Sequence, residues 1–358
     1  MKIIKNSAGY KKKFPGNTKF VDHYELYLSD LFDIKHPQYY KNTPKDKFDL
    51  FKKEYIEKDP GNWAYFPKIK KAFLVPEEKA YHQILTSRNK PFISNDEQEK
   101  FKDFNIGIVG LSIGQSAAIT IARTGGCKNM KIADPDTIDP SNLNRIHTGV
   151  ESVGEYKTDT VRDRLQEINP YQNIITYKDG LTEENISDFF NKDFQLDIII
   201  DACDFFPMKI AIRKFAIQKK IPVLMTTDLG EGVLIDLERY DLKNVKPFGG
   251  RIDNISPSDG FLSSAIKLIS PDFFSVALTN SISQIGQTSS THPQIGSTVY
   301  TSGAIAAYIV RNIANNKKID DERILIDFDQ HLNLEIRTDK YKKDKQEMME
   351  KLKKMIGE

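Results

Sequence analysis

The stretch NIGIVGLSIGQSAA, residues 105–118, decides the fold of the chain around it. A short apolar run ends at Gly110, and a run of small residues begins near Gly114. A buried strand that passes through glycine into a helix points the helix N-terminus at a phosphate. The usual dinucleotide fingerprint has glycine at three positions, whereas Ser112 and Gln115 occupy the second and third here. The stretch alone leaves a dinucleotide, ATP and a turn without a ligand all open.

Apolar strand patterns alternate with helical segments on the C-terminal side of this stretch. The strand patterns are IGIVG, NMKIAD, NIITYKD, LDIIIDAC and IPVLMTT, and the helical segments between them are SAAITIARTG, KTDTVRDRLQEIN, ISDFFNK and MKIAIRKFAIQKK. Strands that are apolar throughout and separated by helices indicate a parallel sheet covered on both faces. We therefore expect an α/β fold: a doubly wound, mostly parallel, Rossmann-like sheet with a helical N-terminal extension.

The chain divides into four regions by composition. Residues 1–104 are rich in lysine and aromatic residues and predict helices and loops, and residues 105–240 hold the nucleotide-binding sheet. Residues 241–337 are expected to complete the same domain with polar loops, a long helix and a hairpin of edge strands. Residues 338–358 predict a charged, solvated helix. Within this order, the Ser-, Gly- and Asn-rich stretch 226–300 is where a substrate tail is expected to lie.

The overall composition excludes several classes of protein. The 358 residues carry a formal net charge of +2, which gives no global electrostatic case for nucleic acid or a membrane surface. The two cysteines, Cys127 and Cys203, are too few for a disulfide framework or a four-cysteine zinc site, so we expect no zinc and a cytoplasmic location. The N-terminus MKIIKNSAGYKKKFPG has no apolar core, so no signal peptide is expected, and no apolar run is long enough to span a bilayer.

An acidic residue and several cationic or amide side chains follow the glycine turn. Asp134 ends the next strand, 24 residues after Gly110, at the place where a ribose hydroxyl is bound in nucleotide folds. Up to this point NAD and ATP fit equally well. The segment SNLNR and then GEYK add the amides and cations that a triphosphate needs beyond backbone amides. Those residues are Asn142, Asn144, Arg145 and Lys157.

The fourth strand ends in DACD, which places Asp201 and Asp204 at the carboxyl side of the sheet. A carboxylate beside a polyphosphate is repulsive unless a hard cation lies between them, and Mg²⁺ accepts one or two carboxylates together with phosphate oxygens. The pattern therefore favours Mg·ATP over NAD, with both aspartates at the place where the metal would lie. Asp201 has a ready alternative role as a cap of the following element, and Asp204 is the less easily explained by such a role.

These motifs together resemble a known family. GLSIG, ADPDTIDPSNLNRIH, VGEYK, INP, IIIDACD and IPVL resemble the ThiF/MoeB/HesA type of ubiquitin-activating-like adenylyltransferases over roughly residues 100–240. The segment GNWAYFPKIKKAFLVPEEKAYHQILTSRNKPFISNDEQEKF resembles a bacterial subgroup of ThiF-family proteins in which GLS replaces GLG. The family's reaction is attack of a substrate carboxylate on the α-phosphate of ATP, which gives an acyl adenylate and pyrophosphate.

The resemblance implies a role for each matching residue. The glycine turn would bind the nucleotide, the next strand end would hold the ribose, and the asparagine, arginine and lysine side chains would bind the phosphates. One aspartate would hold Mg²⁺, and one arginine would reach a phosphate across a homodimer. The turn residues are Gly110, Ser112 and Gly114, and the ribose residue is Asp134. The phosphate-binding residues are Asn142, Asn144, Arg145 and Lys157. Asp204 is the Mg²⁺ residue, and Arg88 is the arginine that would reach across the homodimer.

Substrate and partners stay open within this resemblance. We expect the carboxylate of a small protein or peptide tail, such as the C-terminus of a ubiquitin-like protein. Cys127 and Cys203 are expected to be small buried residues, so adenylation would proceed without an enzyme thioester. His147 and His292 are expected to form hydrogen bonds rather than catalyse.

Three alternatives remain. One is an enzyme like the tRNA threonylcarbamoyladenosine dehydratase, with the lysines of residues 1–71 and 340–354 binding tRNA. The others are a nucleotide-binding scaffold subunit without catalysis and an NAD-binding protein.

Overall fold

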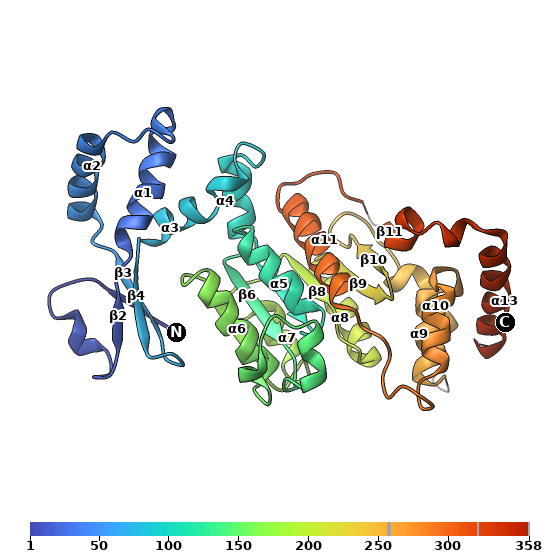
Figure 1. Ribbon diagram of the computed structural model, residues 1–358. Helices are drawn as coiled ribbons and strands as arrows, with labels where there is room; N and C mark the ends of the chain where they lie inside the picture. Colours follow the sequence, from blue (N-terminus) through green and yellow to red (C-terminus); the bar gives the residue numbers. More distant parts are fainter. Residues whose placement is uncertain (256–258, 321, 357–358) are drawn as a thin grey trace.

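A twisted sheet of mostly parallel strands lies at the centre of the molecule (Figure 1). The structure is a computed structural model, and it describes residues 1–255, 259–320 and 322–356. Within these residues the central sheet has seven strands in the order β11-β10-β9-β8-β5-β6-β7. The parallel strands are β5 (Ile106–Val109), β6 (Asn129–Ala133), β7 (Asn173–Tyr177), β8 (Ile198–Asp201) and β9 (Val223–Leu229).

Helices cover both faces of this sheet because its strands are apolar on both sides. One face packs against α4 (Asn95–Asp103), α5 (Gly114–Arg123), α6 (Lys157–Ile168) and α11 (Gly296–Ala314). The other face packs against α7 (Ile186–Asn191) and α8 (Phe206–Lys219). The expected doubly wound α/β fold is therefore confirmed.

The strand order reverses between β5 and β8. From β5 the chain proceeds outward through β6 to β7, and it then returns to place β8 on the opposite side of β5. Open α/β sheets bind ligands outside the carboxyl ends of the strands at such a switch point. The stretch 110–114 follows β5, and residues 202–205 follow β8, so both lie at this point.

The sheet ends in an antiparallel edge. A tight turn joins β9 to β10 (Gly232–Glu238), and β10 pairs antiparallel with β11 (Glu322–Asp327). The edge strand at β11 is as expected, but a second strand over 332–338 is wrong. That segment forms α12 (Phe328–Leu332) and the 3₁₀ turn η8 (Glu335–Arg337). The carboxylate of Asp327 accepts a hydrogen bond from the N–H of Asp329 at 2.8 Å, and this cap starts α12 directly after the strand.

The N-terminal region departs from its expected helical character. Residues 2–75 contain a four-stranded sheet in the order β1-β3-β4-β2 as well as helices. Its elements are β1 (Lys2–Lys5), η1 (Tyr10–Lys13), β2 (Lys19–Val21), α1 (Tyr24–Lys35), η2 (Pro37–Tyr39), α2 (Lys45–Lys58), β3 (Asn62–Phe66) and β4 (Lys71–Val75). The strands have only three to five residues, too short for a period-two pattern to show in the sequence.

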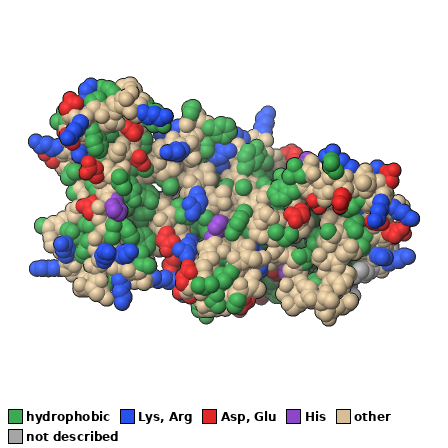
Figure 2. Space-filling model, in the orientation of Figure 1, with side chains coloured by type: hydrophobic (Ala, Val, Ile, Leu, Met, Phe, Trp, Pro, Cys, Tyr) green, Lys and Arg blue, Asp and Glu red, His purple; other side chains and the backbone are tan. Residues whose placement is uncertain are grey.

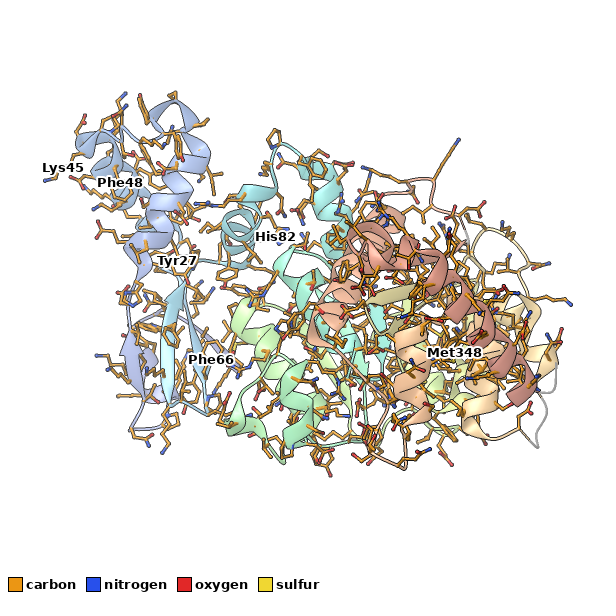
Figure 3. All side chains as sticks on the ribbon, turned by 45° about the vertical axis from the view of Figure 1, so that its right-hand side comes forward. Tyr27, Lys45, Phe48, Phe66, His82 and Met348 are labelled. Atoms are coloured by element: carbon orange, nitrogen blue, oxygen red, sulfur yellow. The ribbon has the colours of Figure 1, made fainter. Side chains whose placement is uncertain are left out.

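Aromatic packing gives this region its own core. The rings of Tyr10 and Trp63 stack at 5.1 Å, and Phe32 of α1 meets Phe48 of α2 edge-on at 5.6 Å. Figure 3 labels Tyr27 and Phe48 on these helices and His82 on α3 (Glu78–Leu85), between this region and the central sheet. The 3₁₀ turn η3 (Ser87–Asn89) then leads into α4.

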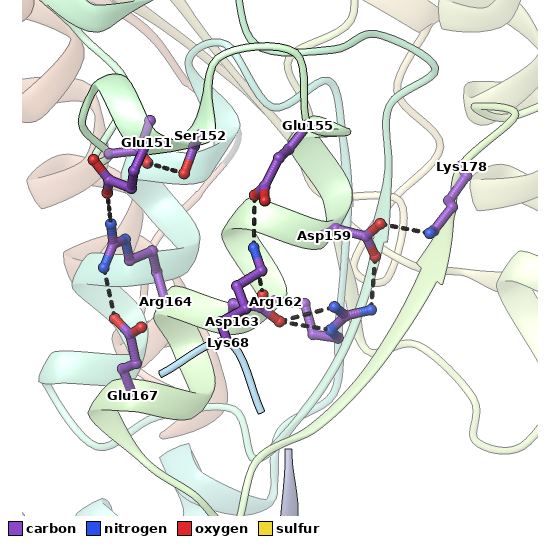
Figure 4. Close-up of polar contacts among 11 residues, drawn as sticks. Lys68, Glu151, Ser152, Glu155, Asp159, Arg162, Asp163, Arg164, Glu167 and Lys178 are labelled. Carbon is purple, nitrogen blue, oxygen red and sulfur yellow. Dashed lines mark hydrogen bonds and ion pairs between the residues drawn. The ribbon is translucent and has the colours of Figure 1, made fainter. Parts of the chain in front are cut away.

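Ion pairs fasten the N-terminal sheet to α6. Lys68, in the β3–β4 turn, lies 2.6 Å from a carboxylate oxygen of Glu155 and 2.9 Å from one of Asp163 (Figure 4). The hydroxyl of Tyr171 accepts a hydrogen bond from Asn62 at 3.0 Å and donates one to the carbonyl of Pro76. The N-terminal region is thus attached to the helix that begins at Lys157.

The C-terminal helices pack beside the antiparallel edge. They are η6 (Pro247–Asn254), α9 (Phe261–Ile269), η7 (Pro271–Phe273), α10 (Val276–Ser283) and α13 (Asp339–Ile356). Leu352 and Ile356 of α13 are buried in a cluster with residues of β9, β10, α9 and α10, so the expectation of a fully solvated tail is wrong. Figure 3 labels Met348 on this helix. Of the polar stretch 247–264, residues 256–258 lie outside the described residues. No helix in the described ranges has the length and apolarity needed to cross a bilayer.

Candidate active site

The glycine turn after β5 requires glycine for two reasons. Gly110 has a φ of 86°, and a Cβ built on it would overlap the carbonyl oxygen of Ala202 after β8. A Cβ on Gly114 would lie 2.7 Å from a methyl of Ile108. The backbone at the start of α5 is therefore drawn close to β8, and its first N–H groups open onto the switch point.

Ser112 and Gln115, the two departures from the glycine fingerprint, both hold the segment around Arg145. The Nε of Arg145 donates to the Oγ of Ser112 at 2.9 Å. Gln115 is fully buried; its side chain donates to the carbonyl of Arg145 at 3.0 Å and accepts from the N–H of His147 at 3.3 Å. The side chains that replace glycine thus fix the arginine beside the turn, which a glycine could not do.

The asparagines of SNLNR are structural in this conformation. Asn142 is buried in η4 (Pro140–Asn144), where its side chain accepts from the N–H of Asp139 at 3.2 Å. Asn144 accepts from the guanidinium of Arg145 at 2.9 Å and donates to the carbonyl of Gln294 at 2.8 Å. Asn144 therefore ties the arginine to the loop that precedes α11.

Asp134 and Lys157 meet at the end of β6. One carboxylate oxygen of Asp134 accepts from the N–H of Leu111 at 2.6 Å, and the other accepts from the N–H of Asp136 at 2.9 Å. The Nζ of Lys157 lies 2.8 Å from the carboxylate of Asp136 and 3.7 Å from that of Asp134. Burial raises the pKa of Asp134, and Lys157 and the amide donors oppose that rise. Asp134 thus fixes the glycine turn directly.

The two aspartates of DACD have different environments. Asp201 is completely buried and accepts from Arg213 at 2.5 Å and from Lys209 at 3.2 Å. Burial alone would raise its pKa, but Lys209 and Arg213 hold it at about 2. The expectation of Asp201 as a second metal candidate is wrong, since its oxygens are already bound by cations. Asp204 is exposed, and its carboxylate has no hydrogen-bond or ion-pair partner within the described part of the chain.

Charged groups converge where β8 and β9 end. Burial lowers the pKa of Arg145, and the negative charges of Asp228 and Asp204 oppose that change. Asp228, near the end of β9, is a residue that the sequence analysis did not name, although it lies in the stretch 226–300 where a substrate tail is expected. The signal that could have found it is the rule applied to Asp204: a carboxylate at the carboxyl end of a strand.

Arg88 does not reach this site within its own chain. It is exposed in η3, and the neighbouring Asn89 donates to the carbonyl of Thr124 at 3.1 Å. Thr124 caps the C-terminal end of α5, opposite the end at the glycine turn. A contact between Arg88 and a phosphate would therefore have to come from a second subunit.

Neither cysteine is suited to attack, and neither histidine stands out as a base. Burial raises the pKa of both thiols, and the thiol of Cys203 donates to Asp201 at 3.2 Å. His147 stacks on Tyr300 at 4.6 Å between ring centroids, and burial lowers its pKa. His292 is exposed and lies within electrostatic range of Asp228.

Comparison with known protein families covers the part of the chain that holds these residues. The family model described as ThiF family matches residues 86–233, from the segment before α4 to the start of β10. Residues 86–233 belong to the ThiF family. The match contains the glycine turn, the Arg145 segment, Asp204 and Asp228.

ThiF-family relatives differ in what their names describe. An uncharacterized protein from Mycobacterium tuberculosis is 29% identical over 274 residues, which cover 74% of this chain and 38% of that protein. The tRNA threonylcarbamoyladenosine dehydratase of Bacillus subtilis is 31% identical over 46% of this chain and 63% of its own length. The adenylyltransferase and sulfurtransferase UBA4 of Candida albicans is 32% identical over 39% of this chain and 31% of its own length. The chain thus spans less than two thirds of each of these relatives.

Solved ThiF-like structures share the fold at low identity. Escherichia coli MccB, crystallised with ATP, superposes with a TM-score of 0.50 and 17% identity over 85% of this chain and 83% of that one. The crystal structure of PaaA gives a TM-score of 0.50 and 18% identity over 70% of this chain and 77% of that one. At these identities the likeness supports the architecture and nothing finer.

Proposed function

We propose that the chain is an Mg·ATP-dependent adenylyltransferase that activates a carboxylate at the C-terminus of a small protein or peptide. The observation that carries this proposal is the position of Arg145. Ser112, Gln115 and Asn144 hold it beside the glycine turn and opposite Asp204. A planar cation fixed next to helix N–H groups suits a phosphate, and an unpartnered carboxylate next to it suits a hard cation.

Each residue of the site would have a separate role in the reaction. The glycine turn and the start of α5 would bind phosphate oxygens through backbone N–H groups, and Asp134 would keep that turn in place. Arg145 would stabilise negative charge that develops at the α-phosphate. Asp204 would hold Mg²⁺, which supplies charge neutralisation when bound. The attacking carboxylate is ionised at neutral pH, so no general base is needed.

Calorimetry and isotope exchange test this proposal. We expect Mg·ATP to bind and NAD to bind more weakly, and the reverse order would contradict adenylation. With a carboxylate substrate from a copurified partner or a neighbouring small protein, ATP–pyrophosphate exchange should appear. Absence of exchange together with intact Mg·ATP binding would instead indicate a nucleotide-binding scaffold.

The Asp204→Asn variant separates a metal role from a structural one. We expect pyrophosphate exchange to fall by on the order of 10²-fold, the scale for loss of one electrostatic stabiliser, with an unchanged melting temperature. Since Asn caps a helix as well as Asp does, a purely structural role predicts near-wild-type exchange. That result would place the metal elsewhere.

A tRNA substrate is the second candidate, and the charge of the N-terminal region favours it. Residues 1–75 hold 16 lysines against 9 aspartates and glutamates, so the overall charge of +2 conceals a basic region. Figure 2 shows Lys and Arg side chains around this part of the surface. A cavity of about 640 Å³ there is bordered by four lysines and two carboxylates: Lys5, Lys35, Lys58, Lys79, Asp59 and Glu77. Anisotropy with bulk tRNA at rising salt tests this candidate, since phosphate contacts give a steep salt dependence.

A further inference from the structure

Asp228 and Asp204 both lie where neighbouring parallel strands, β9 and β8, come to their carboxyl ends. The parallel strands β8 and β9 pair Ile200 with Leu224. Asp204 comes four residues after Ile200, and Asp228 comes four residues after Leu224. β8 ends at Asp201 and β9 continues to Leu229, so Asp204 lies in the loop after its strand and Asp228 lies near the end of its own. The two carboxylates are within electrostatic range of each other at the carboxyl edge of the sheet.

One oxygen of Asp228 lacks a partner. Its Oδ2 is inaccessible to solvent, and no group in the described residues donates a hydrogen bond to it. A buried carboxylate oxygen without a donor is costly, and such orphaned atoms are rare in folded proteins.

Arg145 does not supply the missing partner. Its guanidinium already donates to Ser112, Ser141 and Asn144, and it forms no ion pair within 4 Å among the described residues. A metal site made by protein alone is also absent, since no group of three or more His, Cys, Asp or Glu side chains gathers in the described ranges. Two carboxylates without further protein ligands match the requirement of a cation that arrives with a polyphosphate.

We propose that Asp228 is a second carboxylate ligand of the Mg²⁺ that accompanies ATP, paired with Asp204 across β8 and β9. This inference rests on the proposed function, and it assigns to Asp228 a role beyond that function's residues. The two carboxylates would take two positions around the cation, and phosphate oxygens and water would take the others. Without the cation, the pair would repel the triphosphate.

The test is the affinity of ATP for the Asp228→Asn variant with and without Mg²⁺, measured by calorimetry. With Mg²⁺ we expect the Kd to rise at least tenfold, because a metal ligand is lost. With EDTA instead of Mg²⁺ we expect the Kd to stay the same or fall, because a repelling charge is removed. The matched control is Glu231→Gln, which removes an exposed carboxylate from the adjacent β9–β10 turn and should leave both Kd values unchanged.

Each other outcome overturns the inference in an identifiable way. Equal weakening with and without Mg²⁺ would make Asp228 a residue that positions the site without metal. Unchanged Kd values in both conditions would mean that Asp228 does not bind the metal. Its unpartnered oxygen would then accept a hydrogen bond from a donor on the carboxylate substrate instead. If the wild-type protein binds no Mg·ATP at all, the proposed function fails as well. The smaller Asp228→Ser variant, checked by its melting temperature, replaces Asp228→Asn if the latter does not fold.

Discussion

Ser112 stands where a nucleotide-binding turn usually has glycine, and its hydroxyl accepts a hydrogen bond from Arg145. Removing an acceptor from a charged donor typically changes binding by one to a few kcal/mol. We expect Ser112→Ala to weaken Mg·ATP binding about tenfold in calorimetry, with little change in stability. Ser141→Ala is the matched control, because Arg145 contacts Ser141 only through the backbone carbonyl. Wild-type affinity in Ser112→Ala would show that the hydroxyl does not position the arginine.

For the cysteines we predict that substitution leaves the activity unchanged. A thiol attacks as its thiolate, and the environments of Cys127 and Cys203 both raise the pKa. We expect Cys127→Ala and Cys203→Ala to retain pyrophosphate exchange. Mass spectrometry of the wild-type protein under non-reducing conditions should show no substrate thioester. A thioester that disappears in one of the two variants would overturn this expectation.

The sequence predicted which residues meet at this edge of the sheet and ranked Asp204 before Asp201, but it did not show what makes the two aspartates differ. Carboxyl ends of parallel strands meet at one edge, so the glycine turn, Arg145 and Asp204 were expected to converge, and in the structure they do. Asp201 and Asp204 look alike in DACD, because the difference between them comes from a residue outside that motif. Arg213, on the following helix α8, binds the carboxylate of Asp201 and not that of Asp204. Asn142 was assigned to phosphate, yet its side chain is used inside its own turn.

Three elements are joined by a buried ion cluster behind the site. Arg213 of α8 lies between Asp201 of β8 and Glu238 of β10, at 2.5 Å and 2.8 Å. Breaking a buried pair by removing one partner costs about 3–5 kcal/mol. We expect Asp201→Asn to lower the unfolding free energy by that amount in urea titrations, whereas Asp204→Asn, at an exposed position, should change it little. Equal effects of the two variants would contradict the assignment.

The same cluster predicts a dependence on pH. The pKa of Asp201 is about 2 in the folded protein and near 4 in an unfolded chain. Its stabilisation is therefore fully present above about pH 4 and is lost as the pH falls through about 2. The stability difference between wild type and Asp201→Asn should shrink across that window when unfolding is followed by circular dichroism. A difference that is constant from pH 7 to pH 2 would argue against an ionised Asp201.

Helices and strands with long apolar runs or clear helical periodicity were predictable. Short strands, and strands whose charged residues form ion pairs with distant residues, were not. The five parallel strands and α11 follow from apolar runs and helical periodicity. β10 escaped prediction since Asp236 and Glu238 look like solvent-facing residues, and arginines distant in the chain pair with both. The sheet of the N-terminal region escaped because its strands are short and lie among lysines.

At the scale of the whole molecule, Arg88 requires a second chain to take part in the reaction. It is exposed at the far end of α5, and Phe92 in the same loop is 85% exposed. Twofold dimers are the commonest oligomers, so we expect a homodimer at micromolar concentration in light scattering. Arg88→Ala should lower exchange without dissociating the dimer. A monomeric protein with full exchange activity would remove the trans role.

The contacts that hold α11 in place indicate which segments of this chain can vary in sequence and which cannot. Thr298 and Ser302 donate to Gly230 and Thr226 at 2.6 Å each, and a Cβ on Gly303 would overlap Ser116 of α5. The helix is therefore locked to the nucleotide side independently of the loops before it. The carbonyl of Gln294 is bound by Asn144, so the segment that evolution can remodel without disturbing Arg145 ends before it, at residues 241–293. A chimaera that carries this segment from a relative should keep ATP binding and acquire a different acceptor.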